Sequence, residues 1–563
     1  MKNGKRILII GGVAGGASCA TRARRLSEEA EIIIFEKGPV VSFASCGLPY
    51  YVGDVIKKEE ALLVATADLF RKRFNIDVRL NAEVTSIDRK KNEIEIAELE
   101  VGPHAGLIPH AEGRRYREKY DALVLSPGAS PIRLSVPGAE LPGIFTMRNI
   151  PDSRQIKEWI TKSGARRAMV VGGGFIGLEM TENLARLGLE VTIVEIQPQV
   201  MPLMDPEMMT RVHEELRRHG VSLRLGDAVT GFERLPDGSI SAGMKSGESE
   251  RADIVILGVG VRPQTEIARS AGLEIGKLGG IRVDDRMTTS DPKIWAVGDA
   301  VEVRDFVTGE WALMPLAGPA NRQGRIAADV ILGKDRKFRG SQGTMVCGVF
   351  DLTIASVGPS EKTLRRLALW QNYEKIYLHP VHHAGYFPGA KPISLKLIFS
   401  RDGGRVAGAQ AVGQEGVDKR IDIISMAIQN NATVFDLEEA ELCYAPQYGS
   451  AKDPVNLAGM IASNEIRGDV HFTQWEELQR GDAFILDVRD PSEFAKGHVD
   501  NAVNIPLNEL RARMTELPKD REIKTYCLVG QRSYYAARVL SQHQFDVKTL
   551  SGGYRTRLPE KKE

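Results

Sequence analysis

The chain has 563 residues, too many for one hydrophobic core, and a typical domain of about 150 residues predicts three or four units. Its 75 basic and 74 acidic residues nearly cancel, which argues against nucleic acid or an anionic membrane as a partner. The first apolar run ends at Ile10, and no run approaches the ~18 apolar residues of a membrane span, so we expect a soluble, cytoplasmic chain without a signal peptide.

The N-terminal segment is predicted to form a βαβ unit. We expect strands at 6–10 and 32–35, with a helix over 15–26 between them. Gly11 and Gly16 take the outer positions of a G-x-G-x-x-G turn, while Val13 replaces the middle glycine. Glu36 follows the second strand, 25 residues after Gly11. The pattern predicts a dinucleotide site.

A second βαβ unit repeats this pattern, with strands at 168–171 and 191–194 and a helix that ends near 187. Its turn carries the full motif, at Gly172, Gly174 and Gly177, with Glu179 in the first helical turn. Glu195 ends the next strand, where a carboxylate accepts hydrogen bonds from an adenosine ribose. No arginine follows it, so we expect NADH rather than NADPH as the cofactor.

The rest of the chain divides into three stretches. A third strand at 294–299 ends in Gly298-Asp299 and precedes a helix, and an alternating, β-rich pattern from 344 to 412 then predicts an α+β domain. Past Asn456 we expect a helical stretch and then the polar segment 463–469, which is the best candidate for a linker. The last hundred residues predict a small α/β unit with strands near 483–488 and 523–527.

A candidate redox residue, Cys46, lies in the sequence SFASCGLPY at the expected start of a helix, where the helix dipole favours a reactive thiolate. Over residues 1–455 these motifs, in this order, resemble the pyridine nucleotide disulfide oxidoreductases. Most members carry a second cysteine five positions on, but this chain has Tyr51 there. Cys46 must therefore react with an external thiol or become oxidised itself. The resemblance implies bound FAD, with Asp299 against its ribityl chain, and a homodimer.

Single-cysteine members of the family divide into NADH oxidases or peroxidases and coenzyme A disulfide reductases. The first group has a histidine in the first glycine loop, and this chain has Ala14 there. The second group uses two tyrosines from the partner subunit, which Tyr386 and Tyr444 match, to replace a His-Glu acid-base pair. The resemblance also implies coenzyme A contacts from Ser18, Arg22, Arg25, Ser42, Ser45 and Lys452 of the other subunit, with Asn321 where the group has a histidine. Arg22 and Arg25, three residues apart, are expected to share a helix face as a phosphate clamp.

Residues 470–563 resemble a rhodanese domain. The loop from Cys527 to Arg532 is expected to aim backbone N–H groups at one sulfur, while Arg532 adds a positive charge that stabilises a thiolate and then a persulfide. We interpret Asp487, Arg489 and Glu493 as a structural charge network. Cys19 and Cys347 are expected to be buried structural thiols. No metal is expected, because His379, His382 and His383 have no carboxylate or cysteine at ligand spacing.

These observations predict an α/β enzyme with two Rossmann-like domains, an α+β interface domain and a C-terminal α/β domain. The expected bounds are FAD domain 1–150 and 263–330, NAD domain 151–262, interface domain 331–455, linker 456–469 and rhodanese domain 470–563. The expected activity is NADH-dependent reduction of persulfides or polysulfides, such as coenzyme A persulfide, with release of hydrosulfide and with Cys527 carrying sulfane sulfur. Three alternatives stay open: a coenzyme A disulfide reductase, an NADH oxidase or peroxidase, and a sulfurtransferase whose flavoprotein part senses redox state.

Overall fold

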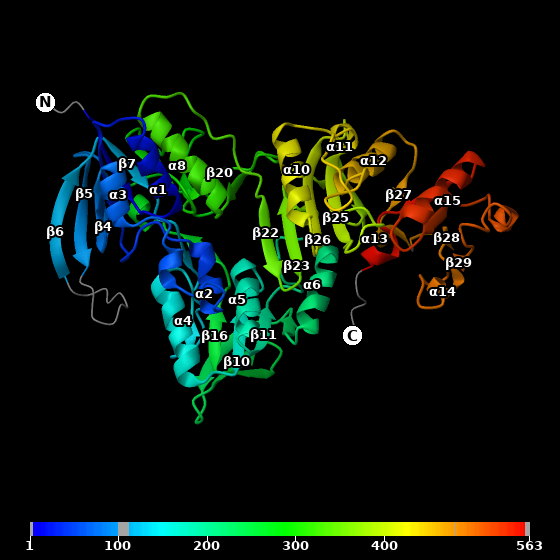
Figure 1. Cartoon of the computed structure of the whole chain (residues 1–563), viewed down its shortest axis with the longest axis horizontal. Helices are drawn as coiled ribbons and strands as arrows, with labels where there is room; N and C mark the ends of the chain where they lie inside the picture. Colours follow the sequence, from blue (N-terminus) through cyan, green and yellow to red (C-terminus); the bar gives the residue numbers. More distant parts are fainter. Residues whose placement is uncertain (1–3, 100–111, 479, 558–563) are drawn as a thin grey trace. The chain divides into compact units, whose positions relative to one another are not determined.

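The computed structural model describes residues 4–99, 112–478 and 480–557. It divides into two compact units, the first made of Met1–Val200 and His219–Gly343, the second of Met201–Arg218 and Thr344–Glu563. Figure 1 shows both units coloured along the sequence. In the described part of the chain, no helix combines the length and the apolar character needed to cross a membrane.

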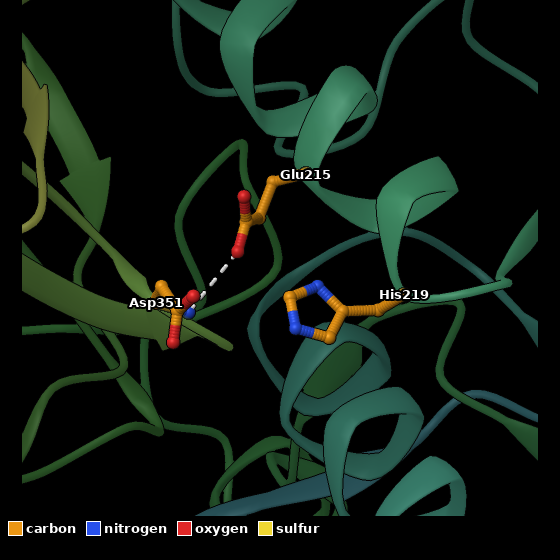
Figure 2. Close-up of side chains that lie close together, drawn as sticks. All are labelled: Glu215, His219 and Asp351. Carbon is orange, nitrogen blue, oxygen red and sulfur yellow. Dashed lines mark hydrogen bonds between the residues drawn. The ribbon is translucent and has the colours of Figure 1, made fainter.

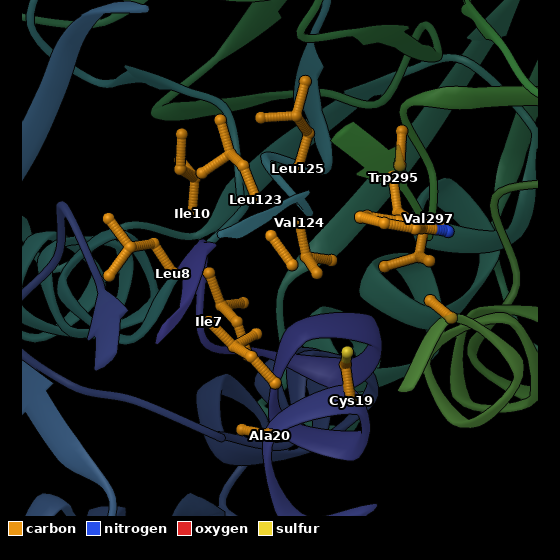
Figure 3. Close-up of a cluster of buried hydrophobic side chains, with 14 of the residues drawn as sticks. Ile7, Leu8, Ile10, Cys19, Ala20, Leu123, Val124, Leu125, Trp295 and Val297 are labelled. Atoms are coloured by element: carbon orange, nitrogen blue, oxygen red, sulfur yellow. The ribbon is translucent and has the colours of Figure 1, made fainter. Parts of the chain in front are cut away.

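The first unit contains a parallel five-stranded sheet in the order β19-β7-β1-β2-β3. Its strands are β1 Arg6–Ile10, β2 Glu31–Phe35, β3 Asp77–Arg79, β7 Ala122–Leu125 and β19 Ile294–Ala296. Helices α1 (Ala14–Arg24) and α8 (Ala317–Ile331) lie side by side near this sheet (Figure 1). They approach closely because Gly324 lacks a side chain, whose Cβ would come 2.2 Å from the carbonyl oxygen of Gly15. Figure 3 shows part of the buried core around this sheet, with Leu8 and Val124 from the strands and Cys19 from α1.

A second parallel sheet in the same unit has the order β12-β11-β10-β16-β9. Its elements are β9 Ile144–Phe145, β10 Arg167–Val171, β11 Glu190–Glu195, β12 Ser222–Leu225 and β16 Ile254–Leu257, with helices α4 Ile150–Ser163 and α5 Phe175–Arg186. β10 is buried over most of its length, as expected for a central parallel strand covered on both faces. Each of the two sheets contains a central strand that is followed by a glycine turn and a helix.

Smaller antiparallel and mixed sheets complete the first unit. They consist of β4 Ala82–Asp88, β5 Glu93–Leu99 and β6 Glu112–Lys119; β13 Val229–Arg234, β14 Ile240–Met244 and β15 Ser249–Ala252; β18 Ile281–Arg282, β20 Val301–Arg304 and β21 Trp311–Leu313; and β8 Ala129–Pro131 with β17 Val261–Pro263. The short helices are η1 Ser45–Gly47, α2 Leu48–Val52, η2 Glu59–Leu62, α3 Ala67–Phe74 and α7 Glu266–Ser270.

The second unit begins with an antiparallel sheet in the order β22-β23-β26-β25-β24. Its strands are β22 Met345–Val349, β23 Leu352–Val357, β24 Tyr373–Leu378, β25 Ile393–Ser400 and β26 Val406–Gly413. The helices around it are α6 Pro206–Arg218, α9 Glu361–Arg366, η3 Trp370–Asn372, α10 Val417–Gln429, α11 Val434–Glu438 and α12 Pro454–Ile466. α10 packs on β23 and β26 and buries Ile421 and Ile424.

A parallel C-terminal sheet belongs to the same unit and has the order β27-β31-β30-β28-β29. Its elements are β27 Phe472–Thr473, α13 Trp475–Leu478, β28 Phe484–Asp487, α14 Pro491–Phe494, β29 Val503–Asn504, η4 Met514–Glu516, β30 Ile523–Tyr526, α15 Gln531–Gln542, β31 Val547–Leu550 and η5 Gly553–Thr556. This sheet is joined to the edge strand β24, because the backbone N–H of Tyr377 donates to Ser551 Oγ at 2.9 Å. The amide of Gln474 also donates to the carbonyl oxygen of Lys375 at 3.1 Å.

The two βαβ openings, the β-rich stretch from 344 and the late α/β unit are confirmed. Two details differ from the prediction. The third strand ends at Ala296, and residues 297–299 form the turn that follows it. The expected linker is helical up to Ile466, because α12 buries Ala458 and Ala462 against the rest of the unit.

Candidate functional site

The two glycine turns share one backbone geometry. Gly11 and Gly172 have φ of +91° and +104°, and a Cβ at these positions would lie 2.1 Å and 2.4 Å from carbonyl oxygens. A Cβ at Gly16 would lie 1.9 Å from the carbonyl oxygen of Gly11, and one at Gly177 would lie 2.0 Å from that of Gly172. Both helices therefore pack so closely on their turns that only glycine fits. Gly174 has open space around it, which leaves room for a ligand near the helix N-terminus.

The carboxylates that follow the second strands occupy equivalent positions. Glu36 accepts hydrogen bonds from the N–H groups of Gly12 and Gly38, both at 2.9 Å. Glu195 accepts them from Gly173 at 2.7 Å and from Gln197 at 2.8 Å. The fold thus brings each predicted ribose-binding acid to the edge of its own glycine turn.

Asp299 lies in the turn after β19, and burial raises the pKa of its carboxyl, while the positive charge of Arg148 opposes that rise. Arg148 is half-buried and donates to the carbonyl oxygen of Pro127 and the amide oxygen of Gln264, at 3.2 and 2.8 Å. Glu36 and Asp299 both interact with its charge. Arg148 was not predicted from the sequence, since no motif or spacing links it to these two acids.

Glu179 is the fifth residue of α5 and is half-buried. Burial raises the pKa of its carboxyl from 4.5 to about 7, and the nearby Glu182 contributes to the rise. Among the described residues, no lysine or arginine forms an ion pair with it. A carboxyl group that changes charge near neutral pH next to a nucleotide turn is a functional-site candidate.

Cys46 is exposed and lies in η1, directly before the five-residue helix α2. Its loop is fixed at both ends, since Ser42 donates its N–H to Gly12 and Ala44 donates to Leu62, at 2.9 and 2.7 Å. Ser42 adopts a left-handed conformation with φ of +49°, and Ser45 is exposed beside Cys46. The loop therefore presents the thiol and the neighbouring Ser45 to solvent.

The expected coenzyme A contacts on α1 are only partly available. Ser18 and Asn321 are hydrogen-bonded to each other, which joins α1 to α8. Arg22 forms an ion pair with Asp329 at 2.7 Å, which the sequence did not predict. Arg25 is the C-cap residue of α1 and is exposed, without an ion pair within the described ranges. Of the expected clamp, only Arg25 is thus an uncompensated cation.

Tyr386 and Tyr444 meet in the second unit although 58 residues separate them, with their hydroxyl oxygens 2.7 Å apart. Both rings are exposed, and the hydrogen bond to Tyr444 raises the pKa of the Tyr386 phenol. A buried ion pair, absent from the predictions, holds the segments around them. Arg420 donates to Asp453 at 2.7 Å and to the carbonyl oxygen of His382 at 2.6 Å. Lys452, the neighbour of Asp453, is exposed.

Two groups of side chains have oxygen or nitrogen atoms close enough to hold a metal, but protein cations bind the carboxylates of both. The ammonium of Lys396, fully buried, lies 2.6–2.9 Å from carboxylate oxygens of Asp205, Glu207 and Glu361. Figure 2 shows Glu215 and Asp351, joined by a backbone hydrogen bond of 3.2 Å, together with His219. The guanidinium of Arg218 contacts both of these carboxylates at 2.7 Å.

The C-terminal loop begins at Cys527, which is fully buried after β30. Gly530 has φ of +93°, and a Cβ at Gly553 would lie 2.5 Å from the carbonyl oxygen of Cys527, so the loop closes on glycines. Arg532 lies near this thiol and binds both oxygens of Glu493, at 2.7 and 2.8 Å. The predicted structural pair of Asp487 and Arg489 is confirmed at 2.6 Å. Glu493, however, does not join that pair and instead binds Arg532.

The remaining cysteines and histidines lie as follows. Cys19 and Cys347 are buried, and burial raises the pKa of the Cys19 thiol to about 12, which makes it unreactive. Cys443 is exposed beside Tyr444. The rings of His382 and His383 are 4.2 Å apart, and His379 binds Ser394 at 3.0 Å.

Residues 5–324 match the family model described as pyridine nucleotide-disulphide oxidoreductase. Residues 344–453 match the dimerisation domain of that family, and residues 473–556 match a rhodanese-like domain. The coenzyme A disulfide reductase of Staphylococcus epidermidis is 36% identical over 458 residues, which cover 81% of this chain and 99% of that protein. The coenzyme A disulfide reductase of Staphylococcus aureus is 35% identical over 461 residues, with the same coverage.

Two solved structures resemble the chain over nearly its whole length. The reduced CoADR-RHD of Bacillus anthracis has a TM-score of 0.94 and 46% sequence identity, and the match covers 98% of each chain. The NAD-dependent persulfide reductase from A. fulgidus has a TM-score of 0.89 and 36% identity, and the match covers 98% of this chain and 100% of the other.

Proposed function

The chain belongs to the pyridine nucleotide-disulphide oxidoreductase family, and on this basis we propose that it is an NADH-dependent flavoprotein that reduces persulfides at Cys46. The observation that carries the proposal is the exposed Cys46, with Tyr51 at the position of the usual second cysteine, in a chain that also carries the Cys527 loop. A lone exposed thiol accepts a small sulfur compound from outside, and the fused domain handles the same sulfur chemistry. The similarity to a persulfide reductase along the whole chain supports this choice.

The domain organisation proposed for this activity keeps the bounds expected from the sequence. The FAD domain is 1–150 with 263–330, the NAD domain 151–262, the interface domain 331–455 and the rhodanese domain 470–563. The matched dimerisation domain supports a homodimer in which the tyrosine pair acts on Cys46 of the other copy.

The residues in both nucleotide turns fit the two dinucleotides. The absence of side chains at the glycines leaves the backbone open to a pyrophosphate, and Glu36 and Glu195 are placed to accept hydrogen bonds from a ribose. Asp299 and Arg148 supply an acid and a cation near the first turn, and Glu179 supplies a half-buried carboxyl beside the second. FAD, when bound, passes two electrons from NADH to sulfur.

The sulfur chemistry balances as follows. The Cys46 thiolate attacks the substituted sulfur of a persulfide RSSH, a new S–S bond forms, the old one breaks, and HS⁻ leaves. Two electrons and one proton then cleave the Cys46 mixed disulfide into the thiolate and RSH. The sum is RSSH + NADH → RSH + HS⁻ + NAD⁺.

The tyrosine pair would supply the proton that the second step consumes. In the hydrogen bond of 2.7 Å between Tyr386 and Tyr444, one hydroxyl donates and the other keeps its hydrogen. That remaining O–H can donate to the departing sulfur anion, the work of a general acid. The ion pair of Arg420 and Asp453 holds the tyrosine segments in place.

The rhodanese part would supply sulfane sulfur. Its loop surrounds Cys527, and Arg532 adds a positive charge near the sulfur, which favours a persulfide anion. Because the domain is tethered to the reductase, its sulfur is presented at a high effective concentration.

The decisive experiment measures NADH oxidation and hydrosulfide release with coenzyme A persulfide, using protein loaded with FAD. We expect Cys46→Ser to lower kcat/KM by at least about a thousandfold, because the nucleophile is lost. Cys443→Ser is the matched control, since Cys443 is also exposed, and it should keep the wild-type rate. Persulfide reduction that survives in Cys46→Ser would overturn the proposal.

A second candidate activity, reduction of coenzyme A disulfide, is favoured by the relatives from Staphylococcus. The ratio of kcat/KM for coenzyme A persulfide to that for coenzyme A disulfide separates the two. A ratio above one supports the persulfide, and a ratio below one replaces it with the disulfide as the substrate.

A further inference from the structure

Three positively charged or hydrogen-bond-donating side chains converge beside the rhodanese part of the second unit. Arg211 comes from α6, His379 follows β24, and Arg555 lies in η5. A Cβ at Gly552 would lie 3.4 Å from His379 Nε2, and Arg555 follows Gly552 by three residues. We propose that Arg211, His379 and Arg555 bind a small oxyanion of the sulfate, thiosulfate or phosphate type at this place.

Hydrogen bonds connect Arg211, Ser394 and His379 in a row, and the last nitrogen of this row lacks a hydrogen-bond partner among the described residues. The Arg211 guanidinium can only donate, and it does so to Ser394 Oγ at 3.4 Å. Ser394 Oγ lies 3.0 Å from His379 Nδ1, and in the tautomer in which the hydroxyl donates to this nitrogen the imidazole hydrogen is on Nε2. His379 Nε2 is buried against the Gly552 backbone, which acts on the pKa of the ring, but no hydrogen bond of good geometry joins the two. A buried N–H without an acceptor is costly, and an anion oxygen would satisfy it.

The charged groups at this place, Arg211 and Arg555, are both positive. Arg211 and Arg555 form no ion pair with a carboxylate among the described residues, and the charge of Arg555 helps to lower the pKa of Arg211, after burial. Glu214 and Glu215 on α6 oppose this effect, but Glu215 is bound to Arg218. Burial and the two arginines lower the pKa of His379 to about 3, so its ring is neutral and can donate from Nε2.

Other buried cations of the same unit form ion pairs with carboxylates. Lys375 and Lys396 each contact Glu361 at 2.8 and 2.9 Å, and Arg420 contacts Asp453 at 2.7 Å. Burying a cation without a counterion is expensive, which explains why these three are paired. The half-buried Arg211 lacks such a partner, so a diffusible anion is the missing counterion.

The site is next to the rhodanese loop but separate from its cysteine. The N–H groups of Tyr554 and Arg555 donate to the carbonyl oxygens of Cys527 and Leu528, at 2.8 and 2.9 Å. Gly552 contacts His379 on the other side. An anion held here would therefore fix the segment that closes the Cys527 loop, without contact to the sulfur.

The test measures sulfate binding by calorimetry at low ionic strength, in FAD-loaded Cys527→Ser protein, so that no sulfur transfer occurs. We expect one saturable site per chain that Arg211→Gln or Arg555→Gln weakens at least about tenfold, since each removes a charge-assisted hydrogen bond. Arg511→Gln is the matched control, because Arg511 is an exposed arginine of the same domain without an ion pair within the described ranges.

Titration with thiosulfate and with phosphate then identifies the ligand by the tighter binding. Arg555 is exposed, so its substitution is expected to preserve folding and keeps the test valid if Arg211→Gln unfolds. Sulfate binding that is absent, or equal in Arg555→Gln and Arg511→Gln, would overturn the proposal. Because binding is measured without NADH, the result is independent of the reductase activity.

Discussion

Replacing Glu179 by glutamine should change how the stability of the protein depends on pH. The pKa of this carboxyl is raised from 4.5 to about 7, first by burial and then by Glu182. A raised pKa means that the folded state holds the proton more tightly than the unfolded state. Below pH 4.5 the Glu179 carboxyl therefore does not lower the free energy of unfolding, and the loss that it causes grows until the pH passes 7.

The magnitude follows from the two pKa values. Between pH 5 and pH 8 the penalty rises by about 2.5 kcal/mol, since one pKa unit corresponds to about 1.4 kcal/mol. Glutamine has no charge to bury, so the free energy of unfolding of Glu179→Gln minus that of wild type should grow by this amount. The variant should gain stability relative to wild type as the pH rises.

Urea unfolding of the FAD-loaded protein at pH 5, 6, 7 and 8 measures this difference, in which all other titrating groups cancel. Glu158→Gln is the matched control, because Glu158 is exposed on α4 and loses little hydration on folding. In a Glu182→Gln background the rise in this difference with pH should be smaller, because the like charge that helps to raise the pKa of Glu179 is gone. A difference between Glu179→Gln and wild type that stays constant within about 0.5 kcal/mol from pH 5 to pH 8 would refute the reasoning.

Three further predictions concern other parts of the chain. Asp453→Ala should lower the free energy of unfolding, measured in urea, by about 3–5 kcal/mol, because it leaves Arg420 buried without its counterion. Lys452→Ala, at the exposed neighbouring residue, should lower it by less than about 0.5 kcal/mol. Equal losses in the two variants would contradict this prediction. Iodoacetamide at pH 8 should label the exposed Cys46 and Cys443 in the native protein, as peptide mapping would show. It should spare Cys19, because burial raises the pKa of that thiol to about 12. Labelling of Cys19 would be inconsistent with its burial. Glu195→Ser combined with Ile196→Arg should raise the ratio of kcat/KM for NADPH to kcat/KM for NADH by about tenfold or more. The reason is that an arginine binds the 2′-phosphate, which Glu195 repels. An unchanged ratio would argue against Glu195 as the ribose ligand.

Several features were predictable because they depend on a few neighbouring residues. A strand, a glycine turn and a helix are local patterns, and the required backbone geometry at Gly11 and Gly172 admits little else. The exposed Cys46 loop also follows from its own segment. Helix α12 was not predicted at its full length, since the polar residues from Ser463 on suggested a linker, but its buried face decides its conformation.

The sequence by itself determined which chemical groups this protein has: two dinucleotide turns with their acids, one cysteine without a neighbour, and a second cysteine loop near the C-terminus. Only the tertiary structure decided which distant groups meet. The pairing of Arg22 with Asp329, of Arg420 with Asp453 and of Arg532 with Glu493 joins residues that no spacing rule connects. The physical reason is that a buried or half-buried charge is satisfied by whichever partner the packed elements bring within reach, and that partner is set by the fold as a whole.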